Sequence, residues 1–337
     1  MGAGLNNIFF LFVISFLSRI LSINLSKPKI RWVILRRLRF GIIRYKYKSL
    51  YFYKMLRIKF FSNFCTHDAC VKDFTRCSDL QKDPALNKTY TFTNEDNYTH
   101  AIILNTAMPV LTIPKENVIG LACEPLIFLG LTKQFIEYAQ KSIGKYLIGE
   151  KRDLPQPFIE YFGYMWHTIT PPNSPPRKPK LMSIMVSHKM FAPGHQYRHT
   201  LCREILKSKL PIDIYGNGCN RHYSQIADSR LKGDFKQNEP YENYLFHIAI
   251  ENCVTPHYFS EKIMNPLLCN TVPVYLGCQN IDTYFNEMVL KLTGNVVEDM
   301  ALLTDICQQK EKYLKTIKLA AVKKTIHFSN VIKLFAA

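Results

Sequence analysis

The polar residues that could do chemistry are densest between Glu251 and Lys262. This stretch joins an apolar run that predicts a strand to a run that predicts a helix capped by Ser260. A capped helix N-terminus offers free N–H groups and the positive end of the helix dipole to an anion such as a phosphate. Lys262 adds a point charge for a diphosphate, and Glu261 could accept hydrogen bonds from ribose hydroxyls. The same pattern also fits a capped surface helix with an ordinary ion pair.

Two other charged residues fit such a site. Arg198 lies at the start of a helix expected over residues 197–209, where a cation opposes the helix dipole and so favours an anionic partner. Glu124 follows the apolar run 118–122, a position that favours a raised pKa and action as a general base. Taken alone, each residue more often has a structural role, Arg198 as a solvated helix residue and Glu124 as a hydrogen-bond acceptor.

Several other chemistries find no support in the motifs. The sequence has no Asp-x-Asp, Walker, G-x-G-x-x-G or G-x-S-x-G pattern and no C-x-x-C pair. Cys65, Cys70 and Cys77, with His67 between them, could hold a metal ion, but buried thiols, with one disulfide at most, fit the spacing better. A metal-bridged diphosphate therefore has no obvious ligand pair in the sequence.

The elements that must position these residues alternate between strands and helices. Short apolar runs predict strands at 56–61, 101–105 and 118–122, with a helix from 131 that Thr132 caps. A proline-rich linker at 171–179 follows, and the alternation then repeats, with strands at 181–187, 212–216, 244–251 and 272–277 and helices at 197–209 and 260–269. We predict an α/β protein with two Rossmann-like domains, 55–176 and 177–300, facing across a cleft, and a helical tail at 301–337.

The strong positive charge of the chain lies mainly in residues 1–54. Of the formal net charge of +18, +11 falls there, because the segment has eleven Lys or Arg and no acid. Residues 55–337 hold 33 basic and 26 acidic residues, which is a modest excess for a nucleic-acid-binding protein. The apolar run Ile8–Leu25 predicts a marginal membrane anchor, although the basic residues on its C-terminal side oppose the orientation that a luminal domain needs. A start at Met55 and a peripheral basic arm are the alternatives.

Several segments together resemble the α-1,3-fucosyltransferases of glycosyltransferase family 10. The similarity lies in Tyr241–Asn252, Tyr258–Lys262 and Asn270–Gly277, which follow the family's order of motifs. The resemblance implies a GT-B fold that transfers fucose from GDP-fucose with inversion and without an obligatory metal. The sequence departs from the family pattern at Leu245, where Lys is usual, and at Ile250, where Phe is usual.

By position, the resemblance also assigns roles to six residues. Arg198 and Lys262 resemble the diphosphate-binding pair, and Glu124 resembles the base. Asn252, Tyr258 and Glu261 resemble donor-site residues. The Leu245 departure could weaken donor affinity and leaves open an inactive sugar-nucleotide-binding relative. A basic nucleic-acid-binding protein is the remaining alternative.

The resemblance says less about the acceptor glycan and the cellular compartment of the protein. The resemblance implies a glycan acceptor that contains N-acetylglucosamine, with an α-1,3 linkage, but the sequence does not identify the glycan. It also implies a single-pass type II protein of the Golgi membrane, or a cytoplasmic one if residues 1–54 are no anchor. Sequons at Asn24, Asn87 and Asn97 are compatible with a luminal location.

Overall fold

The computed structural model describes residues 55–78, 89–167, 169, 171–172 and 176–336. Residues 56–337 form one compact unit. The predicted anchor Ile8–Leu25, the basic stretch after it, and the sequons at Asn24 and Asn87 lie outside the described residues. Within the described ranges, no helix has the length and apolar character that crossing a membrane requires.

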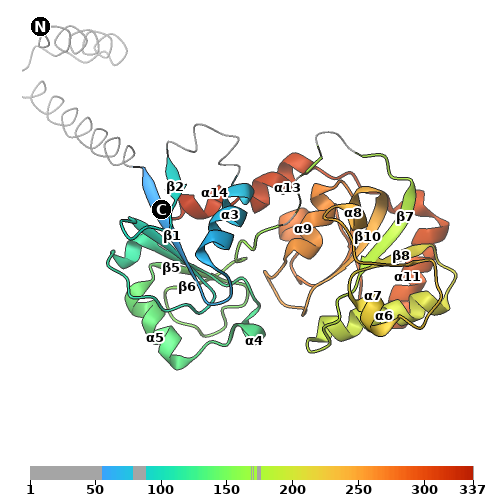
Figure 1. Ribbon diagram of the computed structural model, residues 1–337, viewed down its shortest axis with the longest axis horizontal. Coiled ribbons are helices and arrows are strands. Elements are labelled where there is room, and N and C mark those ends of the chain that lie inside the picture. The colour runs from blue at the N-terminus through green and yellow to red at the C-terminus, as the bar shows by residue number, and fades with distance from the viewer. Residues whose placement is uncertain (1–54, 79–88, 168, 170, 173–175, 337) are drawn as a thin grey trace, which may run out of the picture. The chain divides into compact units, whose positions relative to one another are not determined.

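The N-terminal domain is built on a six-stranded parallel sheet (Figure 1). Its strand order is β2-β1-β3-β4-β5-β6, and helices pack against the sheet as expected for repeated βαβ units. Thr132 caps α5 by accepting a hydrogen bond from Phe135 N, as the sequence predicts. The elements are β1 (Leu56–Ser62), α3 (His67–Cys77), β2 (Tyr90–Phe92), β3 (His100–Leu104), β4 (Val118–Leu121), α4 (Leu126–Leu129), α5 (Lys133–Ser142), β5 (Lys145–Ile148) and β6 (Phe158–Glu160).

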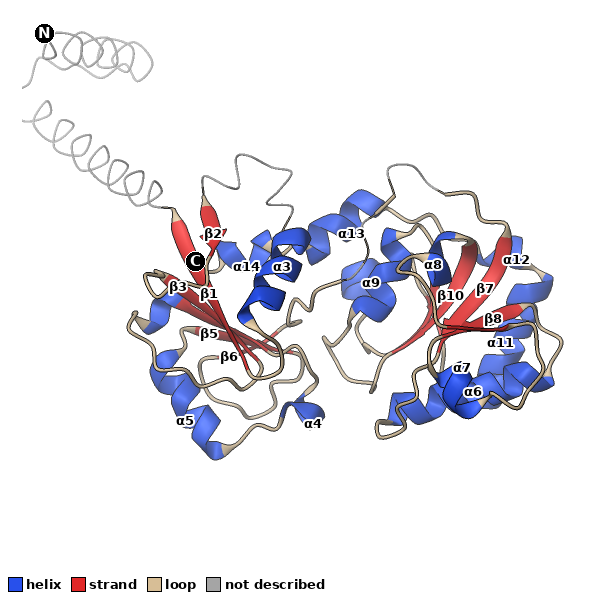
Figure 2. Ribbon diagram, in the orientation of Figure 1, coloured by secondary structure: helices blue, strands red, loops and turns tan. Residues whose placement is uncertain are grey.

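The C-terminal domain repeats this design, with helices beside a second six-stranded parallel sheet (Figure 2). Its strand order is β12-β11-β10-β7-β8-β9, so β10 lies near the middle of the sheet. The elements are β7 (Lys180–Met185), α6 (Pro193–Lys207), β8 (Ile212–Tyr215), α7 (Gly218–His222), β9 (Leu231–Gly233), α8 (Glu239–Glu242), β10 (Tyr244–Ile250), α9 (Glu261–Leu268), β11 (Val272–Leu276), α10 (Asp282–Phe285), β12 (Leu290–Lys291), α11 (Val296–Gln308) and α12 (Lys310–Tyr313).

The C-terminal segment is helical but does not form a separate tail. The predicted boundary at residue 300 falls inside α11, which packs against α6. The chain then continues through α13 (Leu319–Ile326), which packs against α9. Phe328, just before α14 (Ser329–Lys333), lies 4.2 Å from Phe74 between ring centroids, so the segment completes the core of the N-terminal domain.

Aromatic side chains join the two domains. The rings of Phe162 and Phe259 stack with their centroids 4.6 Å apart, and Tyr284 meets Phe162 edge-on at 5.2 Å. Such pairs contribute beyond their buried area, by about 0.5–1.5 kcal/mol each. The contact brings the segment after β6 against the segment between β10 and α9.

Candidate functional site

The site is organised around Glu251, the first residue after β10. Its carboxylate is buried, with 1% of the residue exposed, and accepts hydrogen bonds from Ser260 N at 2.9 Å and Ser260 Oγ at 2.7 Å. Burial raises the pKa of Glu251, while the nearby Lys262 ammonium lowers it. Glu251 therefore fixes the start of α9 to the carboxyl end of the sheet. No role was predicted for Glu251, although a carboxylate at the end of an apolar strand run is a usable signal in the sequence.

Lys262 extends into this cluster from the first turn of α9. Its Nζ lies 3.0 Å from Ser260 Oγ, 3.1 Å from Glu261 Oε1 and 3.5 Å from Glu251 Oε2, and 21% of its side chain is exposed. Burial alone would lower the pKa of Lys262, but Glu261 and Glu251 raise it above its ordinary value. Ser260 caps the helix as predicted, with Lys262 N donating to its Oγ. The N-terminus of α9 thus presents a stable cation, while its first N–H groups bond to Ser260.

Glu261 is paired with Lys262 in this structure. Burial would raise the pKa of the Glu261 carboxyl, but the Lys262 charge and hydrogen bond hold it below its usual value. Its side chain is 32% exposed, so the ionised carboxylate can also accept hydrogen bonds from a bound molecule.

Arg198 lies in the second turn of α6, because this helix begins at Pro193 rather than at the predicted Tyr197. Its guanidinium is buried, donating to Gly194 O at 3.1 Å and to Asn252 Oδ1 at 3.0 Å. Burial lowers its pKa, and Glu251 and Glu261 oppose that shift. Across the part of the chain that the structure describes, no carboxylate lies within ion-pair distance of Arg198. A buried guanidinium with hydrogen bonds but without a paired anion is suited to bind one.

Gly194 allows the close approach between α6 and the end of β10. A Cβ on this residue would lie 1.8 Å from Glu251 O, and Gly194 N donates to Asn252 O at 2.9 Å. Next to it, His195 is buried, and burial together with Arg198 lowers its pKa to about 4. His195 is therefore neutral at pH 7. No role was predicted for it from the sequence.

Tyr258 and Glu124 complete the set of predicted residues. Tyr258 is buried, and burial together with the Glu251 and Glu124 charges raises the pKa of its hydroxyl. Glu124 follows β4 in the N-terminal domain and is half-buried. Burial raises the pKa of Glu124, Lys262 lowers it, and Glu261 and Glu251 raise it. Together with the Arg198–Asn252 hydrogen bond and the Glu261–Lys262 ion pair, these influences indicate that the six predicted residues lie in one region.

Direct contacts confirm that the carboxyl ends of both sheets meet here. Thr255, in the loop after β10, donates to Glu150 Oε2 of the N-terminal domain at 3.2 Å. A Cβ on Gly149, which follows β5, would lie 3.0 Å from Pro256 O. Ligands of open α/β sheets bind beyond the carboxyl ends of strands, so this placement is the expected one.

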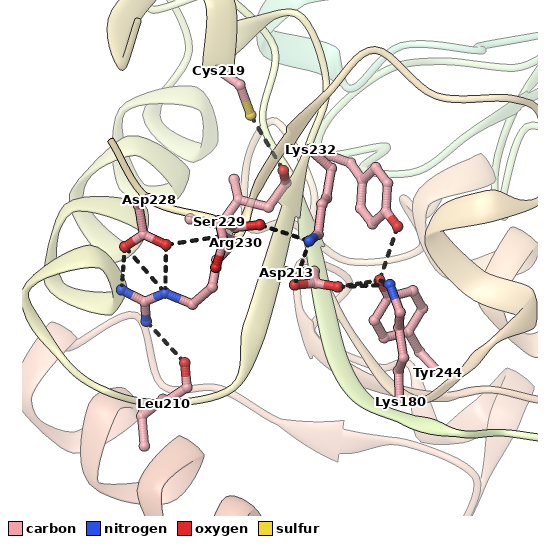
Figure 3. A network of polar contacts seen from close by, with 11 residues as sticks. Lys180, Leu210, Asp213, Cys219, Asp228, Ser229, Arg230, Lys232 and Tyr244 are labelled. Carbon is pink, nitrogen blue, oxygen red and sulfur yellow. Dashed lines mark hydrogen bonds and ion pairs between the residues drawn. The ribbon is translucent and has the colours of Figure 1, made fainter. Parts of the chain in front are cut away.

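The opposite end of the C-terminal sheet carries a separate polar network (Figure 3). Asp213 accepts hydrogen bonds from Tyr244 Oη at 2.6 Å and from Lys180 Nζ at 3.0 Å. Arg230 pairs with Asp228 and donates to carbonyl oxygens at the end of α6. These groups pair with one another, so the network holds the amino ends of the strands together.

Leu245, a departure from the family pattern, lies away from the candidate site. It is the second residue of β10 and packs, half-buried, against the core of the C-terminal domain. Five residues of strand, about 16 Å, separate it from Ile250 at the carboxyl end. The expectation that Leu245 weakens a donor contact is therefore not supported by its position.

The cysteine cluster was also weighed as a metal site. Among the residues that the structure describes, no group of three or more His, Cys, Asp or Glu side chains could hold a metal ion. Cys65, Cys70, Cys77 and His67 therefore do not form the metal site that was weighed as an alternative.

Comparison with known proteins agrees with the resemblance. Residues 175–290 match the family model described as glycosyltransferase family 10 (fucosyltransferase), C-terminal part. The resemblance to glycosyltransferase family 10 is confirmed for this domain. The matched segment contains α6, β10, the loop to α9 and the N-terminus of α9, and therefore all the predicted donor-site residues.

Two curated relatives are fucosyltransferases. The chain is 36% identical over 91 residues to alpha-(1,3)-fucosyltransferase B of Drosophila melanogaster, a match that covers 25% of this chain and 20% of the relative. It is 28% identical over 128 residues to GDP-fucose protein O-fucosyltransferase 3 of Danio rerio, covering 36% and 28%. The matches thus span less than a third of either relative.

Solved structures show the same fold. A crystal structure of alpha1,3-fucosyltransferase matches with a TM-score of 0.50 and 15% identity, covering 83% of this chain and 89% of that chain. An alpha-glucosyltransferase in complex with UDP and DNA matches with a TM-score of 0.53 and 9% identity, covering 84% and 100%. These likenesses show the GT-B fold alone, and the predicted fold class is confirmed.

Proposed function

We propose that this protein is an inverting fucosyltransferase that moves L-fucose from GDP-fucose to a hydroxyl of an acceptor glycan containing N-acetylglucosamine, with an α-1,3 linkage. The observation that carries the proposal is the buried Arg198 guanidinium, which lies in the same charged cluster as Lys262 at the N-terminus of α9. Two cations and a helix N-terminus suit a diphosphate. The family 10 domain that contains them supports GDP-fucose as the donor.

In the proposed reaction, Glu124 removes the proton from the acceptor hydroxyl as its oxygen attacks the anomeric carbon of fucose. The bond between that carbon and the β-phosphate oxygen breaks, and GDP leaves from the opposite face. The raised pKa of Glu124 makes its carboxylate a stronger base than an exposed glutamate. Arg198 and Lys262 stabilise the charge that develops on the leaving diphosphate. We propose that Tyr258, Asn252 and Glu261 hold the donor, with Glu261 toward the ribose.

Calorimetry with residues 55–337 tests the donor site. We expect GDP to bind the unaltered protein, and Lys262→Ala and Arg198→Ala each to weaken binding by about 10- to 100-fold, the value of one charge-assisted hydrogen bond. Binding of GDP that neither substitution changes would refute the assigned site. UDP serves as the matched nucleotide control.

A turnover assay then separates an active enzyme from an inactive relative. GDP-fucose is supplied with N-acetyllactosamine, an N-glycan core and a folded protein domain that offers Ser and Thr hydroxyls. The protein acceptor belongs in the panel because one matched relative is named a protein O-fucosyltransferase. Since Arg198 and Lys262 supply the positive charge, we expect turnover to persist in EDTA. GDP binding without turnover on any acceptor would favour the inactive relative.

We also propose that the protein is a type II Golgi membrane protein with a luminal catalytic unit. The sequon at Asn97 supports this location, because Asn97 is exposed in a loop that a luminal glycosyltransferase could reach. An endoglycosidase shift of the cell-made protein that Asn97→Gln reduces would support it. A protein that carries no glycan at any of its sequons would favour the cytoplasmic alternative.

A further inference from the structure

Two cysteines lie against each other in the turn that connects β1 to α3. Cys65 Sγ and Cys70 Sγ are 2.6 Å apart, and both are thiols in this structure. A disulfide bond measures about 2.05 Å, so a small movement of either side chain would bring the sulfur atoms to bonding distance. Neither residue belongs to the proposed donor site or acts as the proposed base.

The surrounding backbone already holds the pair in place. Ser62 Oγ accepts hydrogen bonds from Cys65 N at 3.1 Å and from Cys65 Sγ at 3.2 Å, which fixes the turn after β1. Thr66 caps α3 by accepting from Ala69 N, and Cys70 N donates to Thr66 O at 3.1 Å. The turn and the first turn of α3 thus order both side chains before any bond forms, which reduces the entropy that closing the bond would cost.

The two thiols differ in access to solvent. Cys65 is partly exposed, whereas Cys70 is 1% exposed. An external disulfide can therefore reach Cys65 first, and Cys70 then lies beside the intermediate that forms. In thiol–disulfide exchange, an accessible thiol such as Cys65 attacks first and a neighbouring shielded thiol such as Cys70 resolves the mixed disulfide.

We propose that Cys65 and Cys70 form a reversible intramolecular disulfide by exchange with a small disulfide of the glutathione class. The Cys65 thiolate attacks one sulfur of oxidised glutathione, and the first glutathione leaves as a thiolate. The Cys70 thiolate then attacks Cys65 Sγ, closes the protein disulfide and releases the second glutathione. Two protein thiols are oxidised, one glutathione disulfide is reduced, and the two protons pass to the two glutathione thiolates.

The bond would lie at the edge of the sheet that carries the proposed base. Asn63, in the same turn, donates to Thr106 Oγ1 of the loop after β3 at 2.9 Å. Asn105, the residue before Thr106, accepts a hydrogen bond through Oδ1 from Cys123 N at 2.9 Å, and Cys123 directly precedes Glu124. The disulfide would therefore link the turn after β1 covalently to α3, close to the segment that contains Glu124.

One tryptic peptide tests the proposal. Residues 60–72 contain both cysteines and no internal Lys or Arg, so an intramolecular bond leaves this peptide two hydrogens lighter and blocks both thiols from alkylation. The full-length protein is equilibrated in glutathione buffers from fully reduced to fully oxidised, denatured in N-ethylmaleimide, and digested. We expect the doubly alkylated peptide to be replaced by the lighter, unalkylated one as the buffer becomes oxidising.

Three outcomes would overturn the proposal: two alkyl groups on this peptide in every buffer, a stable glutathione adduct on Cys65, or a bond from either cysteine to another peptide. Cys65→Ser tests the order of attack and should leave Cys70 reduced and alkylated in every buffer. Cys77→Ser, in the same helix, is the matched control and should leave the transition of the 60–72 peptide unchanged. The readout is a mass, so failure of the proposed fucosyl transfer would not affect it.

Discussion

Replacing Lys262 with methionine removes the ammonium but keeps an apolar side chain of similar length. The change isolates the charge that faces Glu251, whose carboxylate is fully buried and lies 3.5 Å from Lys262 Nζ. Because no other Lys, Arg or His within the described residues pairs with Glu251, the substitution leaves a buried carboxylate without a cation. Removing one partner of a buried ion pair costs about 3–5 kcal/mol when the remaining charge stays ionised.

The cost should depend on pH. Burial already raises the pKa of Glu251, and Lys262 is the main group that lowers it, so Lys262→Met should raise that pKa further. A carboxyl with a folded-state pKa above its unfolded value of 4.5 binds its proton more tightly when folded. Stability is then greatest below the unfolded pKa and falls as pH rises toward the folded pKa, by up to about 1.4 kcal/mol per pH unit. The deficit should be small close to the unfolded pKa and should grow as the pH rises above it, until it reaches its full size above the folded-state pKa.

Urea unfolding followed by the fluorescence of Trp166 measures this deficit for residues 55–337 between about pH 5 and about pH 8. Glu251→Gln and the double variant complete the cycle, because glutamine keeps an acceptor for Ser260 N and carries no charge. The double variant should lose the pH dependence. A Lys262→Met deficit that stays constant with pH, or a pH dependence that survives in the double variant, would refute the assignment of Glu251 as the titrating partner.

Three further predictions address the base, the close approach and the distant network. Glu124→Gln should lower turnover by about 10²–10⁴-fold and leave GDP affinity unchanged. In the pH–rate profile, the fall in activity below the raised pKa of Glu124 should disappear. Equal loss of turnover and GDP affinity would contradict the base assignment. Gly194→Ala places a Cβ 1.8 Å from Glu251 O, so unfolding should show a loss of about 1–3 kcal/mol and calorimetry a weaker GDP affinity through Arg198. Arg230→Met should cost about 3 kcal/mol in unfolding with GDP affinity unchanged, since Arg230 bonds carbonyls at the far end of α6.

Features determined by neighbours in the chain were predictable from sequence. Ser260 and Thr132 cap their helices as expected, because a cap needs only its own side chain and the next turn. The parallel sheets followed from alternating apolar runs and helices. The start of α6 was missed, because Pro193 and Gly194 were left outside the helix expected over residues 197–209. Proline is compatible with the first turn of a helix, and this glycine is required by an approach to Glu251 that only the folded chain creates.

Features that depend on distant segments could not be read from the chain. Glu251 was visible as an acid after a strand, but its bond to Ser260 and its proximity to Lys262 arise only when α9 returns to the sheet. The role of Phe328 was hidden in the same way, because its partner Phe74 lies at the other end of the unit. Burial of aromatic surface, rather than any local signal, brings this segment back to the N-terminal domain.

Leu245 stands where the family usually has Lys. Its place in β10 makes it possible to test whether a departure far from the carboxyl end of a strand affects GDP affinity. In a parallel sheet the ligand lies beyond the carboxyl ends, and Leu245 is near the amino end of β10, about 16 Å from Ile250. Leu245→Lys, which restores the usual family residue, should therefore leave GDP affinity unchanged in calorimetry, while Lys262→Met weakens it by about 10- to 100-fold. A gain in GDP affinity on Leu245→Lys would show that position 245 acts on the donor site from the opposite end of the strand, and would restore the departure as an argument for an inactive relative.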